Sequence, residues 1–239
     1  MAELLPLGPD GLLVRFSDRL DEPANRAALA FRAMLTETQF RGVIETATSL
    51  TSVYLRFRPD HVSRAHLVER VQQALDGNDW FTSPLPKGRT LWHVPVAFGN
   101  EHGPGLDAAA QLAGLSPEAA IAEVTATTLR VLALGFAPGQ PYLGFLPQHW
   151  NIPRQSEVTP EVPRGAVVIA VRQIIPFANA APTGWRQIGR TGFRCYDAEA
   201  TPSMPLRPGD EVRLQAVTAS ELDRLTADPL GGAEAEVLT

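Results

Sequence analysis

The stretch GFAPGQPYLGFLP, residues 135–147, holds three glycines and three prolines between two apolar flanks. Proline fixes φ near about −65° and glycine permits backbone conformations closed to other residues, so this loop is stiff and has a defined shape. Its backbone N–H groups are suited to holding an oxyanion or a phosphate. A rigid connection between two structural elements is the alternative, and the loop's composition leaves both open.

The sequence that follows this loop predicts a compact barrel or sandwich of short strands. Short apolar runs such as AVVIAV at 166–171 and EVRLQAV at 211–217 are separated by Pro/Gly clusters. Pro208-Gly209-Asp210 predicts a tight turn before the last strand, and 219–225 predicts a closing helix. Two short connecting helices are expected before the loop, at 106–112 and from Ser116, where Pro117 occupies the first helical position.

The first part of the chain predicts a small two-layer domain. GLLVRF at 11–16 has the pattern of a strand, and Asp21 is expected to cap a helix with apolar residues at helical spacing. Two extended segments follow, at 43–47 and 52–57, and then a second helix that ends at Asp76-Gly77-Asn78.

The segment LWHVPVAF, residues 91–98, is expected to close this sheet as a split βαβ arrangement, with the linker at 82–89. The predicted fold class is therefore α+β. A two-layer domain over residues 1–88 is followed by a closed β-barrel domain with connecting helices over residues 89–239.

Composition excludes several classes of function. The 239 residues, 44% of them hydrophobic, suffice for one or two globular cores. A net charge of −5 with no Lys/Arg run argues against nucleic-acid binding. The N-terminus has no signal-peptide pattern, no apolar run approaches membrane-spanning length, and the single cysteine fits a reducing compartment. We expect a cytoplasmic protein without membrane contact.

PTGWRQIGRT, residues 182–191, is a second candidate for chemistry. Arg190 is able to hold a carboxylate or phosphate through two parallel hydrogen bonds, with Thr191 adding a hydroxyl, although an arginine here pairs across strands as often. Trp185 is more often a core anchor than a stacking platform. Further polar side chains lie between the two loops, with solvated surface as the alternative reading: Arg154, Arg164, Arg172 and Gln173.

Several standard sites are missing from the sequence. It has no G-x-x-x-x-G-K, G-x-G-x-x-G, G-x-S-x-G or H-E-x-x-H motif. The five histidines show no metal-ligand spacing, so no metal site is expected: His61, His66, His93, His102 and His149. Cys195 lies in an apolar run and is expected to be a small buried hydrophobe.

The order of these motifs resembles a known family. GFAPGQPYLGFLP, IPR at 152–154, PRGAVVIA at 163–170, PTGWRQIGRT and LRPGDEV at 206–212 occur in the order seen in the 5-oxoprolinase B subunit and in allophanate hydrolase subunit 1. A kinase inhibitor of bacterial sporulation and part of urea carboxylase share that domain. The resemblance implies a small α+β domain followed by a cyclophilin-like closed barrel.

The resemblance also implies a function. It predicts a subunit of an ATP-dependent amide or lactam hydrolase, which opens 5-oxoproline to glutamate or acts on allophanate, with ATP as co-substrate. The implied partners are a subunit-2 polypeptide and, as a second candidate, an amidohydrolase-like subunit. The residues expected to be catalytic are Arg154, Gln173, Arg190 and Thr191. The residues expected to bind substrate or nucleotide are Gly135, Phe136, Pro138, Gly139, Tyr142, Gly184, Trp185 and Gly189.

Departures from the family pattern keep other functions open. Gln140 stands where relatives usually have phenylalanine, Thr183 where they have glycine, and apolar residues such as Val124 and Leu129 replace polar ones. The apolar replacements favour a non-catalytic module that regulates a histidine kinase. A diverged paralogue with another small-molecule substrate is a third possibility.

Two structural expectations follow. The 135–147 loop and the 182–191 turn are expected to line one cleft that contains Arg190, because loops at one end of a closed barrel converge. An exposed apolar patch for the partner is expected near Phe136, Tyr142, Phe145 and Trp150.

Overall fold

The computed structural model describes residues 2–238. The chain divides into two compact units, the first extending to Lys87 and the second beginning at Gly88.

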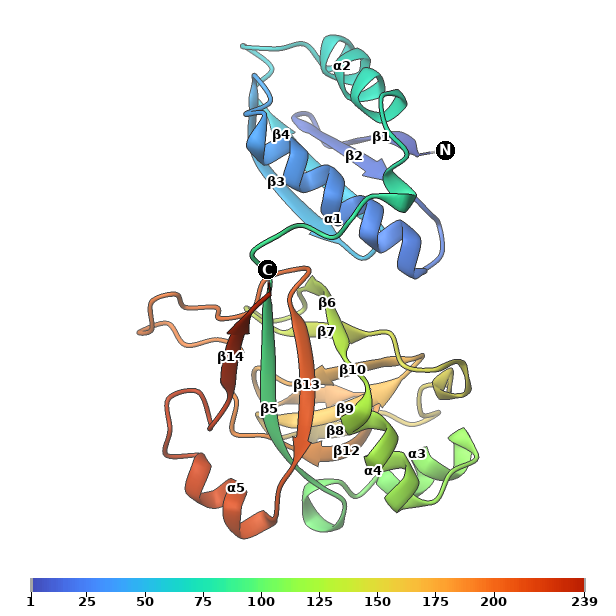
Figure 1. Cartoon of the computed structure of the whole chain (residues 1–239), viewed down its shortest axis with the longest axis vertical. Coiled ribbons are helices and arrows are strands. Elements are labelled where there is room, and N and C mark those ends of the chain that lie inside the picture. Colours follow the sequence, from blue (N-terminus) through green and yellow to red (C-terminus); the bar gives the residue numbers. More distant parts are fainter. Residues whose placement is uncertain (1, 239) are drawn as a thin grey trace. The chain divides into compact units, whose positions relative to one another are not determined.

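The first unit is an antiparallel sheet with two helices (Figure 1). The strand order is β1-β2-β4-β3. Its elements are β1 (Glu3–Leu7), β2 (Gly11–Arg15), α1 (Glu22–Glu37), β3 (Val43–Ser49), β4 (Ser52–Phe57), α2 (Arg64–Asp76) and the short helix η1 (Trp80–Thr82).

The split βαβ arrangement is confirmed in this unit. Strands β2 and β3 each pair antiparallel with β4, so they run parallel to each other with β4 between them and α1 as their connection. Asp21 caps α1 as expected, because its carboxylate accepts a hydrogen bond from the Ala24 N–H at 2.8 Å. The alternating residues Val53, Leu55 and Phe57 are all buried in the core of the unit.

The expected closing strand of this sheet was assigned wrongly. Residues 91–98 belong to the second unit, and the additional strand of the first sheet is β1, which precedes β2. β1 has a proline and a largely exposed pattern, so alternation does not reveal it.

The second unit carries the remaining strands and helices. These are β5 (Thr90–Phe98), η2 (Asn100–His102), α3 (Leu106–Ala113), α4 (Pro117–Ala126), β6 (Leu129–Leu134), β7 (Pro141–Gly144), η3 (Gln148–Trp150), β8 (Thr159–Val162), β9 (Ala166–Ala170), β10 (Gln173–Pro176), β11 (Ala181–Thr183), β12 (Arg186–Arg190), β13 (Glu211–Ala216), α5 (Ala219–Leu225) and β14 (Glu234–Val237). The helix expected at 219–225 is confirmed, whereas the last strand is β14 rather than β13.

Seven strands of this unit form the predicted closed β-barrel, in the order β12-β9-β10-β7-β6-β13-β5 (Figure 1). Pairing of β12 with the second half of β5 closes the barrel, with Gly189 opposite Phe98 and Arg190 opposite Ala97. β14 pairs with the first half of β5, and β5 and β13 are parallel neighbours.

Gly189 permits this closure. A Cβ atom at Gly189 would lie 2.7 Å from Val96 Cγ1 and 2.8 Å from the Ala97 carbonyl oxygen, which are closer than real Cβ contacts. A residue that the sequence suggested for ligand binding is therefore placed where two strands must approach closely.

The two faces of the barrel wall carry separate apolar clusters. Ile174 belongs to the large cluster inside the barrel, whereas its neighbour Ile175 belongs to a smaller cluster with Val168, Phe177 and Trp185. Successive side chains of a strand point to opposite faces, so this smaller cluster covers the outer side of β9 and β10. The two-stranded sheet of β8 and β11 contributes Val162 to it.

Candidate functional site

A small cleft lies beside Trp185, next to the outer apolar cluster. Its volume is about 190 Å³, and its lining includes Phe136, Gln140, Tyr142, Arg154, Phe177 and Trp185. We call it the Trp185 cleft. It brings together the Gly/Pro loop after β6 and the turn before β12, as expected, but on the outer face of the barrel wall rather than at a barrel end, because the interior is filled with side chains.

Aromatic rings form the walls of this cleft. The Tyr142 and Trp185 rings meet edge to face, with centroids 6.5 Å apart. The Arg154 guanidinium lies 5.6 Å from the centroid of the Trp185 ring. Arg154 is exposed and makes no hydrogen bond or ion pair within residues 2–238, so its N–H groups are available to a ligand.

Gln140 supplies a buried amide at the cleft. The side chain is 1% exposed, and its Oε1 accepts a hydrogen bond from the Ala178 N–H at 3.3 Å. Among the described residues, Nε2 donates no hydrogen bond. Nε2 is therefore free to donate to a ligand acceptor in the cleft. The sequence singled out the loop but not this residue.

The loop that carries Gln140 is held in place by its own backbone. The Gly135 N–H donates to the Gln140 carbonyl oxygen at 3.0 Å, and the Gln140 N–H donates to that of Ala137 at 3.1 Å. A Cβ at Gly139 would collide with the Cys195 carbonyl oxygen, so only glycine allows this approach. Phe136 has φ of 71° and is 73% exposed at the rim of the cleft.

The turn on the opposite side of the cleft is fixed by hydrogen bonds. The Thr183 hydroxyl accepts from the Trp185 N–H at 3.1 Å, and the Gln155 N–H donates to the Gly184 carbonyl oxygen at 2.6 Å. Gln155 Nε2 also donates to the Trp185 carbonyl oxygen at 3.3 Å. Both walls are therefore ordered before any ligand binds.

The residues that line the cleft are suited to binding a ligand rather than to nucleophilic catalysis. No lining residue is His, Cys, Asp, Glu or Lys, so the cleft holds no nucleophile paired with a general base. Its polar side chains are those of Arg154, Gln140, Tyr142 and Thr183, and the first two supply N–H donors among aromatic and apolar walls. These suit a small, flat molecule that carries a carboxylate and a carbonyl oxygen.

Arg190 and Thr191 do not line the Trp185 cleft, so the expectation of one shared cleft is wrong for them. They line a separate pocket of about 380 Å³ at the other end of β12. A strand rises about 3.3 Å per residue, so the five residues from Trp185 to Arg190 span roughly 16 Å. The Thr191 hydroxyl accepts a hydrogen bond from the Phe193 N–H at 3.1 Å, which makes it part of the local turn.

The other predicted polar residues lie outside the cleft. Gln173 is buried at the start of β10 and is absent from the cleft lining. Arg172 donates to the Leu146 carbonyl oxygen at 2.8 Å, and its guanidinium lies 6.0 Å from the centroid of the Phe145 ring. Gly135 and Pro138 shape the loop without lining the cleft.

Residues 2–206 match the family described as carboxyltransferase domain, subdomain C and D. The chain is 31% identical to the 5-oxoprolinase B subunit of Bacillus subtilis (strain 168), over 91% of this chain and 92% of that protein. The chain belongs to the family of the 5-oxoprolinase B subunit. This agrees with the resemblance seen in its motifs.

Solved structures show the same fold. The crystal structure of TTHA0988 superposes with a TM-score of 0.71 at 31% identity; the match covers 87% of this chain and 40% of that one. The urea amidolyase of K. lactis superposes with a TM-score of 0.73 at 17% identity, over 99% of this chain and 16% of that protein. The latter likeness concerns the fold alone.

Only part of the apolar patch expected for a partner is exposed. Phe136 is open to solvent and Tyr142 and Phe145 are half-buried, but Trp150 is fully buried. The Trp150 indole N–H donates to the Glu123 carboxylate, and His149 Nε2 lies 2.7 Å from the same oxygen. Trp150 is a core residue because a partner for its one polar atom lies inside the unit.

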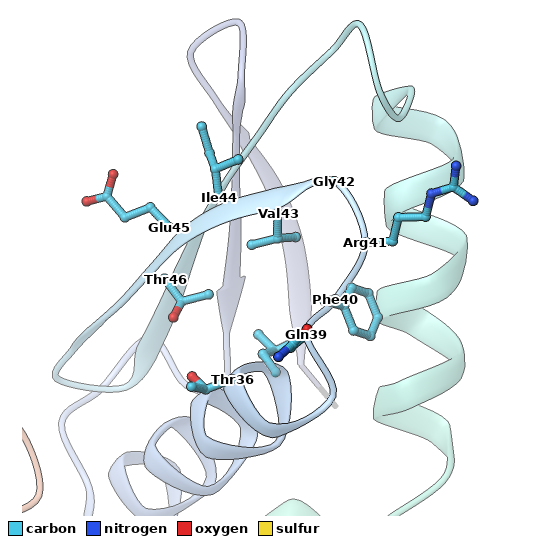
Figure 2. A pocket seen from close by; sticks show the side chains of 10 residues that line it. Thr36, Gln39, Phe40, Arg41, Gly42, Val43, Ile44, Glu45 and Thr46 are labelled. Carbon is cyan, nitrogen blue, oxygen red and sulfur yellow. The ribbon is translucent and has the colours of Figure 1, made fainter.

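Another pocket of about 340 Å³ lies in the first unit, between the end of α1 and the start of β3 (Figure 2). Its charged side chains, Arg41 and Glu45, project in opposite directions in Figure 2. Glu45 accepts a hydrogen bond from Arg56 at 2.8 Å. No charged groups converge there, so we assign it no site.

Residues 2–238 contain neither a cluster of metal-ligating side chains nor a helix suited to span a membrane. Among them, no group of three or more His, Cys, Asp or Glu side chains is placed to hold a metal ion. In the same residues, no helix has the length and apolar character needed to cross a bilayer.

Proposed function

We propose that this chain is the substrate-binding subunit of a multi-subunit, ATP-dependent lactam hydrolase of the 5-oxoprolinase type. The observation that carries the proposal is the pair of donors at the Trp185 cleft. Arg154 and Gln140 face one small space between aromatic rings, and no nucleophile paired with a general base accompanies them. 5-Oxoproline is a flat ring with one carboxylate and one lactam carbonyl, which matches these donors.

The donors support a specific division of labour. Arg154 would hold the carboxylate, and the Gln140 amide would donate to the lactam carbonyl oxygen. An unstrained lactam is a poor electrophile, and phosphorylation of its carbonyl oxygen by ATP would activate it for attack by water. The groups for phosphoryl transfer and water attack would come from a subunit-2 partner, and an amidohydrolase-like subunit is a second candidate partner.

The test is reconstitution with the subunit-2 homologue. The chain alone is expected to bind 5-oxoproline without hydrolysing ATP, and the mixture is expected to form glutamate and ADP in equal amounts. A sharper test compares Arg154→Gln with the control Arg213→Gln, which removes the same positive charge. Arg213 is a suitable control because it is an exposed residue of β13. The first should raise the KM for 5-oxoproline about tenfold or more, and the control should leave it unchanged.

Two results would reject the proposal. ATP hydrolysis by the chain alone would show that the catalytic groups are within it. A chain that binds neither lactam nor the subunit-2 homologue, but recovers a histidine kinase in pull-downs, would support the regulatory module instead. Turnover of allophanate without turnover of 5-oxoproline would keep the cleft and change the substrate.

A further inference from the structure

The pocket at the far end of β12 has an unusual concentration of positive charge. Arg164, Arg190 and Arg194 line it, against one acidic lining residue, Asp223. The chain as a whole has a net charge of −5. We call this the arginine pocket.

The three guanidinium groups retain free donors. Arg190 is exposed and makes no hydrogen bond or ion pair within residues 2–238. Arg164 donates one bond to the Tyr196 carbonyl oxygen and Arg194 one to the Asp197 carboxylate, each at 3.3 Å. A guanidinium has five N–H donors, so most of those on both side chains remain available.

The opposing acid does not cancel this charge. Asp223 forms no ion pair with the three arginines in the described part of the chain. Asp197 pairs with Arg194 and also lies close enough to Arg164 to interact with its charge, so it offsets part of the positive charge, but it does not line the pocket. Gly192 also lines the pocket, and its N–H donates no hydrogen bond among the described residues. The pocket thus offers convergent donors from the turn before β9, the end of β12 and the segment after it.

We propose that the arginine pocket binds a phosphate-bearing small molecule at a site separate from the Trp185 cleft. A carboxylate has two oxygens, which one arginine fork satisfies, whereas a phosphoryl group presents three oxygens to several forks. The volume of about 380 Å³ exceeds one phosphoryl group and leaves room for the rest of a ligand. This proposal stands without the lactam hydrolase, because it concerns only the chemistry of the ligand's anionic group.

The experiment is a calorimetric titration of the full chain with pyrophosphate at low ionic strength. Arg164→Gln and Arg190→Gln are each expected to weaken binding about tenfold or more, because each removes one charged fork. Both side chains are exposed, so the variants should fold, and circular dichroism checks this. The control is Arg213→Gln, which makes the same change in net charge on β13 and should alter binding by less than about twofold.

A second measurement separates the two sites. Pyrophosphate should leave the NMR signal of the Trp185 indole N–H in place, since that ring lines the other cleft. The proposal is overturned if Arg213→Gln weakens binding as much as the pocket variants, if pyrophosphate moves the Trp185 signal, or if glutarate binds as tightly as pyrophosphate. None of these outcomes depends on whether the chain binds 5-oxoproline.

Discussion

The two ends of β12 present opposite chemistry. Before the strand, Trp185 is 6% exposed and the adjoining cleft is small, aromatic and free of acidic residues. At its other end, Arg190 is exposed and the adjoining pocket is wider and lined by charged side chains. One strand therefore holds two sites roughly 16 Å apart. Neighbouring sequence motifs do not have to serve the same ligand.

The difference follows from what covers each end. The Trp185 end lies against the outer apolar cluster with Val162 of the β8–β11 sheet, so apolar surface surrounds the few donors that decide specificity. At the other end, the arginine pocket has Asp223 of α5 as its acidic lining residue and keeps its guanidinium groups hydrated. A compact neutral or singly charged ligand suits the first, and a multiply charged one suits the second.

The largest losses of stability and of binding are expected when the pairing of β12, the strand next to both sites, is disrupted. In Gly189→Val, the new side chain would overlap Val96 and the Ala97 carbonyl oxygen, so closure of the barrel should be lost. We expect a loss of about 3 kcal/mol or more in the free energy of unfolding of the barrel unit, together with loss of binding at both sites. Urea unfolding followed by tryptophan fluorescence measures this.

The control for that variant is Gly135→Ala. A Cβ at Gly135 meets no atom within 4 Å, so this change should leave stability nearly unaltered. If Gly189→Val folds with normal stability and keeps both binding activities, β12 is not the element that positions the two sites.

The next largest loss of affinity is expected at the Trp185 cleft alone. Trp185→Leu removes the ring that Tyr142 and Arg154 contact, so binding of 5-oxoproline should weaken by about 2 kcal/mol, roughly thirtyfold. Pyrophosphate binding by the same variant should be unchanged and would show that the barrel is folded. Equal losses for both ligands would mean that the two ends of β12 form a single site.

A smaller loss of affinity for 5-oxoproline is expected when the amide of Gln140 is removed. Gln140→Leu removes the free Nε2 donor, and binding of 5-oxoproline should weaken by about 1.4 kcal/mol, about tenfold. Gln148→Leu is the matched control, because Gln148 is exposed on η3. Stability is measured separately, since the variant also leaves the Ala178 N–H without its acceptor. Unchanged affinity would show that the amide does not face the ligand.

Local patterns predicted much of the fold. Alternation identified the buried face of β4, and the side-chain caps of α1 and α4 are those expected from Asp21 and Ser116. The residue pattern of β5, however, does not indicate which strand it pairs with. That strand pairs in parallel with β13, with Leu91 opposite Glu211, and no local feature of either segment reveals the other.

The sites were harder to predict for the same reason. Tyr142 and Trp185 were recognised because they lie in unusual Gly/Pro sequences, but the role of Gln140 depends on the Ala178 N–H that it meets in space. The sequence predicts that Arg190 shares a site with Trp185 because both lie within residues 182–191, but the extended geometry of β12 separates them. Periodicity reports which face a residue occupies, not which distant group it meets.

The smallest effect concerns Cys195, which directly follows Arg194 of the arginine pocket and is buried. Burial raises the pKa of its thiol from 9.0 to about 12, although the charge of Arg164 acts in the opposite direction. Because the folded state has the higher pKa, its contribution to stability is complete below pH 9 and is lost as the pH rises from 9 towards 12.

Between pH 7.5 and 9.5 the free energy of unfolding should therefore fall by roughly 1 kcal/mol through this group alone. Urea unfolding at the two pH values measures it, and Cys195→Ala should remove that part of the decrease while also lowering stability at both pH values. The pH-dependent difference is the informative quantity, because the cavity left by the substitution is the same at both. An equal decrease in both proteins would show that the thiol ionises as readily in the folded chain as in the unfolded one, and that solvent reaches behind the arginine pocket.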